Sequence, residues 1–390
     1  MFDFSCFLTD TYAIALTSAL LLALLYLCLY YGLYHMRVGR HHPAPSPDAP
    51  ADSALPPISV VLTAMNDSAW LKENLVYLLE QDYPDFEIVV VDYISQDDTQ
   101  FVLKLLSDYY PNLKIVSFKG DQTLKEDVNL FQGKKYPLSI GIKCAKNDIL
   151  LLADPDCIPQ NPHWLHGMVE GYQKTGTQIV AGYCGITRTK TPLGWLQQYD
   201  NLAYSAHYLG SILLGHPYTA SGRNLSYRRS FFFQQGGFIS HYDVADGADD
   251  LFVYQNARKD NIAISIEPQA CLAADPYRTF GQWHESRRRR VATRNRHSLA
   301  SRLAEQLPTL ANLLFYAAAT LLLLQACLPW PVVAILVALK WAWQIICFSR
   351  LTRRFHGGWI HWAAPLMEIY FIIANTILLL LPLRNNKRFK

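Results

Sequence analysis

The chain has 390 residues, of which 51% are hydrophobic and only 17% are charged. Its length exceeds that of one ordinary domain, and its composition indicates segments that lie in a membrane. A net charge of +3 argues against a protein that binds nucleic acid. The eight cysteines show no C-x-x-C spacing, so neither a zinc site nor a disulfide framework is expected.

Residues 1–40 are expected to form an N-terminal membrane anchor. Residues 12–34 carry no charge over a length that can span a hydrocarbon core of ~30 Å. No small-residue cleavage site follows them, which favours a retained signal anchor. Asp3 and Asp10 precede this segment and Arg37 and Arg40 follow it, so the positive-inside rule places the following residues in the cytoplasm. An integral protein of the plasma (inner) membrane is therefore predicted.

Residues 41–57 are rich in Pro and Ala and predict a semi-stiff linker. After the linker, strand and helix patterns alternate through a domain expected over residues 58–278. The expected strands are 58–63, 86–92, 113–118 and 148–153, and the expected helices between them are 68–81, 98–109 and 138–146. This alternation predicts βαβ units, and thus an α/β fold with a mostly parallel sheet and helices on both faces.

The second half of the chain is more mixed. A strand is expected over 178–187 and helices over 193–209 and 249–258. Residues 279–306 alternate arginines with apolar residues, which is typical of a helix in the membrane interface. Residues 307–390 contain three apolar spans, 308–329, 331–349 and 362–383, so four membrane segments are predicted with the anchor. If the last span crosses the membrane fully, the basic tail from Arg384 to Lys390 lies outside the cell, which conflicts with the positive-inside rule. The side of the tail therefore stays open.

A short apolar strand, Ile149 to Leu152, is followed by Asp154-Pro155-Asp156. The carboxyl ends of parallel strands form the edge at which open α/β sheets bind ligands. Two carboxylates one residue apart supply hard oxygen donors for Mg²⁺ or Mn²⁺ carrying a diphosphate. A polar turn that merely closes the strand is the alternative interpretation.

Several other short motifs occur in a fixed order around this one. They are Thr63-Ala64-Met65-Asn66-Asp67, Val91-Asp92-Tyr93-Ile94-Ser95 with Asp97, Asp98 and Thr99, Gly133-Lys134-Lys135 with Gly141-Ile142, Ser221-Gly222-Arg223-Asn224-Leu225 and Asp249-Asp250-Leu251. Their order resembles that of the membrane-bound family 2 glycosyltransferases, which carry a cytosolic GT-A domain between transmembrane segments. The resemblance implies a Rossmann-like GT-A domain and a nucleotide-sugar donor, with a UDP-sugar expected.

The resemblance also assigns expected roles to individual residues. On the donor side, Asp67 and Asp92 would bind ribose or base, Asp154 the sugar or nucleotide as well as the metal, and Asp156 the metal. Lys134 or Lys135, and an arginine among 287–290, would meet the diphosphate; Arg289 is the position that matches the family motif. Asp249 or Asp250 would be the general base on the acceptor hydroxyl. The alternatives are turn or helix-capping acids, and arginines that bind anionic lipid.

Three departures from the family pattern limit these assignments. Tyr93 replaces the second acid of the V-D-D motif, which weakens the expectation of uracil specificity. The Q-x-x-R-W motif falls on Ser286 to Arg290 and keeps only Arg289. The acidic motif has two registers, one of which places Ala248 at the position of the base. Outside the motifs, Lys340 and Glu368 lie at similar depths in two membrane spans and are expected to form an ion pair, with guidance of an acceptor lipid as the alternative.

The sequence therefore predicts an inverting, metal-dependent glycosyltransferase that adds a sugar to a lipid or glycan acceptor at the bilayer. A processive polysaccharide synthase is the alternative within the same class. A non-catalytic membrane protein that retains the fold is the alternative from another class.

Overall fold

The computed structural model describes residues 11–42, 55–118, 133–244 and 246–380. They form two compact units. The helical unit consists of residues up to His41 with Gln198–Gly210 and His297–Pro382, and the sheet unit consists of His42–Gln197 with Ser211–Arg296. Most of the predicted linker, the acids Asp3 and Asp10, and the basic tail from Arg384 lie outside the described residues.

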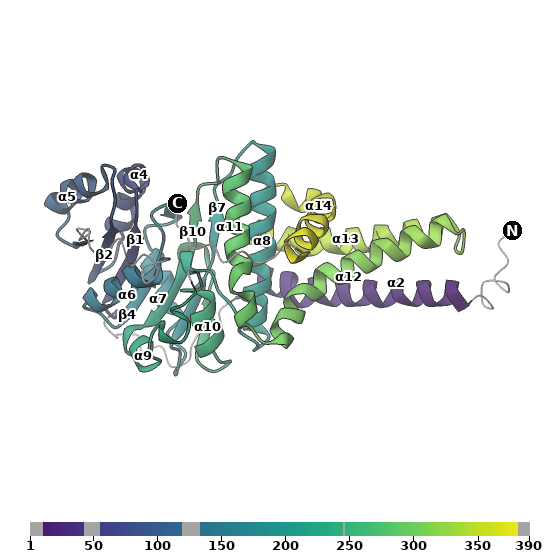
Figure 1. Ribbon diagram of the computed structural model, residues 1–390, viewed down its shortest axis with the longest axis horizontal. Helices are drawn as coiled ribbons and strands as arrows, with labels where there is room; N and C mark the ends of the chain where they lie inside the picture. The colour runs from purple at the N-terminus through teal and green to yellow at the C-terminus, as the bar shows by residue number, and fades with distance from the viewer. Residues whose placement is uncertain (1–10, 43–54, 119–132, 245, 381–390) are drawn as a thin grey trace. The chain divides into compact units, whose positions relative to one another are not determined.

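A seven-stranded sheet in the order β3-β2-β1-β4-β8-β6-β9 forms the centre of the sheet unit (Figure 1). Its strands are β1 (Ile58–Ala64), β2 (Phe86–Tyr93), β3 (Leu113–Phe118), β4 (Ile149–Leu152), β6 (Ile179–Gly182), β8 (Leu225–Arg228) and β9 (Ile262–Ser265). Strands β3, β2, β1 and β4 are parallel to one another, and β6 is parallel to β9. Only β8 runs antiparallel to its neighbours β4 and β6. The predicted α/β fold with a mostly parallel sheet is confirmed.

A second sheet contains three short strands, β5 (Cys157–Pro159), β10 (Leu272–Ala274) and β7 (Cys184–Ile186), in that order. The prediction of a single strand over residues 178–187 is wrong, because this range contains two strands, β6 and β7, that belong to different sheets. Strand β6 pairs with β8 and β9, whereas β7 pairs with β10, so the chain passes from one sheet to the other at Tyr183.

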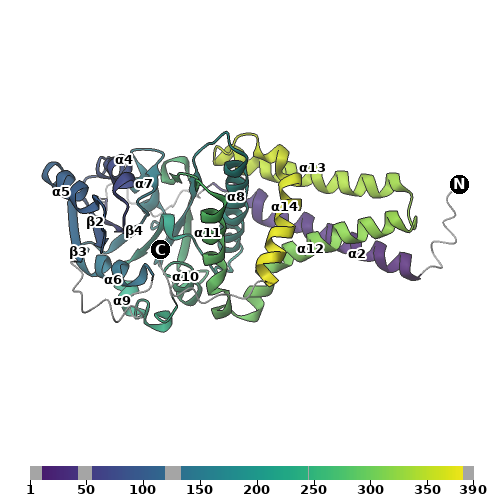
Figure 2. The same ribbon diagram turned by 45° about the horizontal axis from the view of Figure 1, so that its top comes forward.

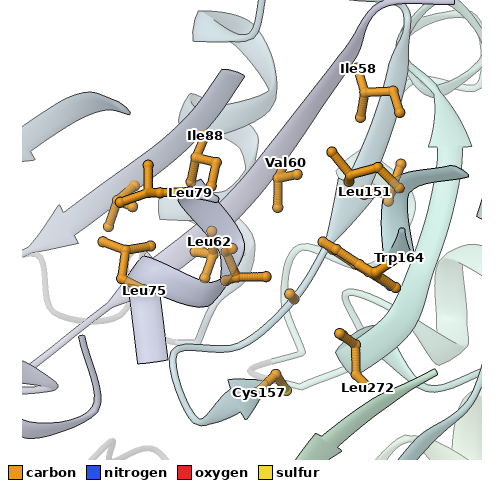
Figure 3. Packing of buried hydrophobic residues seen from close by; sticks show 14 of the residues in the cluster. Ile58, Val60, Leu62, Leu75, Leu79, Ile88, Leu151, Cys157, Trp164 and Leu272 are labelled. Atoms are coloured by element: carbon orange, nitrogen blue, oxygen red, sulfur yellow. The ribbon is translucent and has the colours of Figure 1, made fainter. Parts of the chain in front are cut away.

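Helices pack on both faces of the large sheet because successive side chains of a strand point to opposite faces. Val61 and Val91 face α6 (Lys135–Cys144), which approaches so closely that a Cβ at Gly141 would lie 2.5 Å from Val61. The alternate residues, among them Val60 and Leu62, belong to a buried core on the other face (Figure 3). That core includes side chains of α4 (Ser68–Leu79), α5 (Thr99–Tyr109) and α7 (Trp164–Glu170).

The remaining helices of the sheet unit follow the strands of its second half. They are the short α9 (Arg229–Gln234), α10 (Asp250–Asn256) and α11 (Phe280–Ala292). The two ends of α8 (Pro192–Leu213) also belong to this unit, and its middle belongs to the helical unit. The basic stretch 279–306 is divided: Thr279 and Gln282 form a capping box that starts α11, a 3-10 turn follows over Thr293–Arg296, and α12 begins at Leu299.

The helical unit contains four helical stretches that are long and apolar enough to cross a membrane: Thr11–Gly39, Leu299–Leu324, Trp330–Arg354 and Ile360–Ile377. The first combines α2 (Thr11–Tyr30), the π-helical turn Tyr31–Met36 and α3 (Arg37–Gly39); the others are α12 (Leu299–Leu324), α13 (Trp330–Arg354) and part of α14 (Ile360–Leu380). The four predicted segments are confirmed as candidate spans, although α12 begins nine residues before the predicted boundary of 308, with Pro308 inside it.

Within this unit, α14 crosses α12 and α13 rather than running alongside them (Figures 1 and 2). Lys340 of α13 and Glu368 of α14 form the expected ion pair, and both side chains are almost completely buried. Tyr31 donates a hydrogen bond to the same carboxylate, and Lys340 Nζ donates one to Tyr316 of α12 at 3.0 Å. The ion pair and these two hydrogen bonds thus connect all four apolar segments.

Candidate active site

Three parallel strands end side by side, and each is followed by an acid or ends in one. Strand β1 pairs Ala64 with Asp92 of β2, so the loop that carries Asp67 begins beside Asp92. Strand β4 pairs with the other side of β1 and ends two residues before Asp154. The sheet order therefore places the three sequence-predicted acids at one edge.

Strand β8 runs in the opposite direction, so its N-terminal end lies at this same edge. Leu225 of β8 pairs with Leu152 of β4. The segment Gly222–Asn224, a 3-10 turn that precedes β8, consequently reaches the acids that follow β4. Asn224 fixes this turn, since its Nδ2 donates to the carbonyls of Tyr183 and Ala270 at 2.9 and 2.8 Å.

Asp154 and Asp156 lie between two cationic side chains, and these four residues are called the carboxylate–cation cluster below. Lys134 Nζ lies 2.6 Å from Asp154 Oδ1. Arg223 Nη2 lies 2.8 Å from Asp156 Oδ2, and Arg223 Nε lies 3.5 Å from Asp154 Oδ2. Burial raises the pKa of Asp154, but the charges and hydrogen bonds of Lys134 and Arg223 outweigh burial and hold that pKa below its usual value.

Asp154 and Asp156 are the residues that fit a divalent ion. One oxygen of each contacts the same guanidinium, so the space between the two acids already accommodates positive charge. No group of three or more His, Cys, Asp or Glu side chains in the described ranges could hold a metal. Two carboxylates suffice for Mg²⁺ when phosphate and water oxygens complete its coordination shell.

Asp92 and Asp67 lie beside this cluster in different environments. Asp92 is fully buried, and neither of its carboxylate oxygens has a hydrogen-bond partner among the described residues. An unpartnered buried carboxylate is costly and calls for an explanation, such as a ligand that donates to it. Asp67 accepts a hydrogen bond from Met65 N at 2.8 Å, and burial is the main cause of its raised pKa.

Asp249 contacts the same turn that carries Arg223. Gly222 N donates to Asp249 Oδ2 at 2.6 Å. A Cβ at position 222 would lie 2.8 Å from that oxygen, so the contact requires glycine. Asp249 is the N-cap residue of α10, yet its side chain makes no capping hydrogen bond. Asp249 therefore does not act as a helix-capping acid through its side chain.

Asp250, the next residue, is held within the protein. Its carboxylate accepts hydrogen bonds from Leu251 N at 2.6 Å and from Thr293 Oγ1. Burial, and then the charge of Asp249, raise the pKa of Asp250 to about 7, against the lowering effect of the Thr293 hydroxyl. The negative charge of Asp249 thus disfavours the charged form of Asp250.

Lys134 and Lys135 lie at the start of α6, and their side chains contact different parts of the protein. Lys134 joins the carboxylate–cation cluster, whereas Lys135 is 1% exposed and donates to the carbonyls of His241 and Val244 at 2.6 and 2.8 Å. Burial lowers the pKa of Lys135 to about 8, although the charge of Asp250 opposes this shift. Lys135 thus fixes the loop that precedes the acid pair and does not contact the cluster.

Arg289 is exposed on α11. Burial raises the pKa of Asp246, and the charge of Arg289 opposes that shift, which places Arg289 on the side of the acid pair. Arg287 is instead buried, with its guanidinium 5.4 Å from the centroid of the Trp283 ring. The arginines of this stretch therefore do not act as one patch.

Sequence reasoning missed two residues of this site, Arg223 and Thr293. Arg223 lies within the Ser221–Leu225 motif, but its contact with Asp156 depends on the antiparallel strand β8, which was not expected. Thr293 reaches Asp250 over 43 residues of sequence, and no local pattern marks it.

Residues 59–234 match the family model described as glycosyl transferase family 2. The glycosyltransferase AglE of Haloferax volcanii is 33% identical over 137 residues, 35% of this chain and 41% of that protein. The poly-beta-1,6-N-acetyl-D-glucosamine synthase of Staphylococcus epidermidis is 24% identical over 235 residues, 58% of this chain and 52% of that protein. The chain thus spans about half the length of these relatives, or less.

A solved structure with a similar fold is the mannosyltransferase PcManGT of Pyrobaculum calidifontis, determined in complex with GDP-Man and Mn²⁺. The two chains align with a TM-score of 0.58 and 20% identity, over 94% of this chain and 97% of the other. At this level of identity the likeness concerns the fold, which is of the GT-A type.

Proposed function

We propose that this chain, whose residues 59–234 match the model of glycosyl transferase family 2, is a glycosyltransferase that transfers a sugar from a nucleotide diphosphate to an acceptor held at a membrane. The observation that carries this proposal is the turn Gly222–Arg223. Gly222 N contacts Asp249, and the next residue, Arg223, contacts Asp154 and Asp156. Two consecutive residues of one turn therefore contact the acids proposed for the donor, Asp154 and Asp156, and the acid proposed for the acceptor, Asp249.

On the donor side, Asp154 and Asp156 would hold Mg²⁺ or Mn²⁺, which neutralises charge on the leaving diphosphate when it is bound. Lys134 and Arg223 would donate hydrogen bonds to the phosphate oxygens, since both already neutralise carboxylates at this point. Asp92 and Asp67 would contact the base and ribose. We propose a UDP-sugar as the first donor to test, with other bases as alternatives because Tyr93 replaces an acid of the family motif.

On the acceptor side, we assign the general base to Asp249. Its Oδ2 is oriented by Gly222 N, and its side chain is not engaged in capping α10. The ionised Asp250 lies next to this base in the chain, and its negative charge would favour the arrival of the acceptor proton at the acid pair. Asp249 would remove the proton of the acceptor hydroxyl while the diphosphate leaves from the opposite side of the anomeric carbon. Such a single displacement inverts the configuration of that carbon.

The four apolar helical stretches support an acceptor at the bilayer and a protein that is integral to the membrane. Arg37 and Arg40, at the C-terminal end of the first helical stretch, support a cytoplasmic sheet unit under the positive-inside rule. A processive synthase is the alternative within the class. The Q-x-x-R-W motif of long-glycan synthases keeps only Arg289 here, which favours a lipid-linked acceptor and a single addition.

The direct experiment uses the full chain, purified in detergent, with Mn²⁺ or Mg²⁺. UDP- and GDP-sugars are offered one at a time with membrane lipid extracts, and the released nucleoside diphosphate is measured. One donor should give release that depends on both the metal and the extract. A protein that releases no diphosphate with any donor, metal or extract would instead be the non-catalytic membrane protein.

A further inference from the structure

We propose that Arg223 makes the binding of the divalent ion depend on the nucleotide diphosphate. Before the donor arrives, the Arg223 guanidinium takes the place of the ion between Asp154 and Asp156. When the donor arrives, the guanidinium leaves these acids and binds the diphosphate. This inference rests on the proposed function and names the residue that would order the two binding events.

The contacts of Arg223 are those that an ion would need. Its Nη2 and Nε contact the Oδ2 atoms of Asp156 and Asp154 at 2.8 and 3.5 Å. The three side chains are only 19–23% exposed, so water and salt screen their attraction weakly. Arginine stays charged at any working pH, and it donates from several N–H groups in a fixed plane. The guanidinium therefore competes directly with an ion for both oxygens.

Lys134 competes less than Arg223 does. Of the two acids in the cluster, its Nζ contacts Asp154 alone, and it does so through Oδ1 rather than Oδ2. Lys134 can therefore keep its contact while Oδ2 binds an ion, whereas Arg223 cannot keep both of its contacts. An ion without a nucleotide would have to displace Arg223 and then lie close to its unneutralised guanidinium and to the ammonium group of Lys134. Its binding alone should consequently be weak.

A diphosphate removes this obstacle, because its oxygens offer Arg223 a new bidentate partner of opposite charge. The surroundings of Arg223 allow it to move between partners. Nη2 lies 3.4 Å from the Tyr277 hydroxyl, and the guanidinium carbon lies 5.9 Å from the centroid of that ring. The backbone of Tyr277 is fixed by two hydrogen bonds with Gln197, at 2.8 and 3.0 Å. The ring can thus stay beside the guanidinium while the guanidinium changes partners.

Two ligands that each favour the same position of Arg223 must favour each other's binding, by the same factor in both directions. Couplings of this kind are typically about 5- to 150-fold. The Arg223→Gln variant removes the competing charge. It should bind Mn²⁺ alone more tightly than the parent by about this factor, and added nucleoside diphosphate should then tighten Mn²⁺ binding much less.

The experiment measures free Mn²⁺ by electron paramagnetic resonance with the full chain in detergent, first with Mn²⁺ alone and then with UDP or GDP. Arg228→Gln is the matched control, because Arg228 lies in the adjoining strand and pairs with Asp148 at 3.3 Å, away from the cluster. This control should behave like the parent in both arms. Arg223→Lys retains a competing charge, and its affinity for Mn²⁺ alone should lie closer to that of the parent.

The outcomes separate this inference from the proposed function. If Arg223→Gln binds Mn²⁺ alone no more tightly than the parent, while the parent shows coupling with a nucleotide, the role of Arg223 is wrong and the metal-dependent function stands. If the parent does not bind Mn²⁺ even with either nucleotide, both proposals are wrong. Equal tightening of Mn²⁺ binding by nucleotide in the parent and in Arg223→Gln also contradicts the role of Arg223.

Discussion

Replacing Thr293 by Val should shift the acid limb of sugar transfer to higher pH. Thr293 Oγ1 donates to Asp250, whose pKa burial and the charge of Asp249 raise to about 7. A hydrogen bond to a charged group contributes about 1.5–3 kcal/mol, and one pKa unit corresponds to about 1.4 kcal/mol. Loss of this hydroxyl should therefore raise the pKa of Asp250 by about one to two units.

The sign follows from the role of the pair. The negative charge of an ionised Asp250 favours the arrival of the acceptor proton at the acid pair, so transfer should weaken as the pH falls through the pKa of Asp250. At pH 7.5, a pKa of about 7 leaves roughly three quarters of Asp250 ionised, whereas a pKa of about 8 leaves roughly one quarter. The Val variant should thus be about three-fold slower at this pH, or slower still with a larger shift, and should recover at alkaline pH.

The assay is single-turnover transfer measured over a range of pH values. Thr293→Ser is the matched control, because it keeps the hydroxyl and loses only a methyl group in a residue that is 2% exposed. Its acid limb should stay with that of the parent. If the Val variant has the same acid limb as the parent, Asp250 does not govern the base and the assignment of the acid pair is refuted.

Three further predictions concern the base, the membrane charge pair and the orientation. Asp249→Asn should lower kcat by about 10²- to 10⁴-fold with donor affinity and thermal stability retained, and unchanged kcat would place the base elsewhere. Lys340→Met leaves Glu368 buried without its cation, so it should cost about 3–5 kcal/mol of stability in thermal unfolding, and a second change, Glu368→Gln, should recover part of that loss. Cys327, in the turn between α12 and α13, should react with an impermeant maleimide on intact cells, whereas Cys144 of α6 should react only after the membrane is opened; the reverse pattern would invert the proposed topology.

Much of the fold was predictable because its first half consists of strongly apolar strands with helices between them. Each acid that follows such a strand could be placed at one edge from the parallel order alone. The strand β8 was not predictable in this way, because its sequence, Leu225-Ser226-Tyr227-Arg228, contains no apolar run like that of β4. The position of Arg223 depends on that strand, so the sequence identified its motif but not its contact with Asp154 and Asp156.

The sequence also could not choose between Lys134 and Lys135. Neighbouring residues at the start of a helix point about 100° apart, so at most one of them could face the acids after β4. Which one faces them depends on the rotation of α6, and this rotation is set by the contact of Gly141 with Val61 and Val91. Such packing is a property of the folded chain, and only the structure could place Lys135 against the loop before the acid pair.

The most direct test of the account is the metal-dependent release of nucleoside diphosphate by Asp156→Asn. This variant keeps the shape of the side chain but removes one of the two carboxylates that would hold the ion. Release should fall by at least ~10²-fold, equivalent to about 2.7 kcal/mol in the barrier. The control Asp85→Asn, an exposed acid that pairs with Lys146 at 3.3 Å, should retain the activity of the parent. Full metal-dependent release by Asp156→Asn would contradict the proposed donor site.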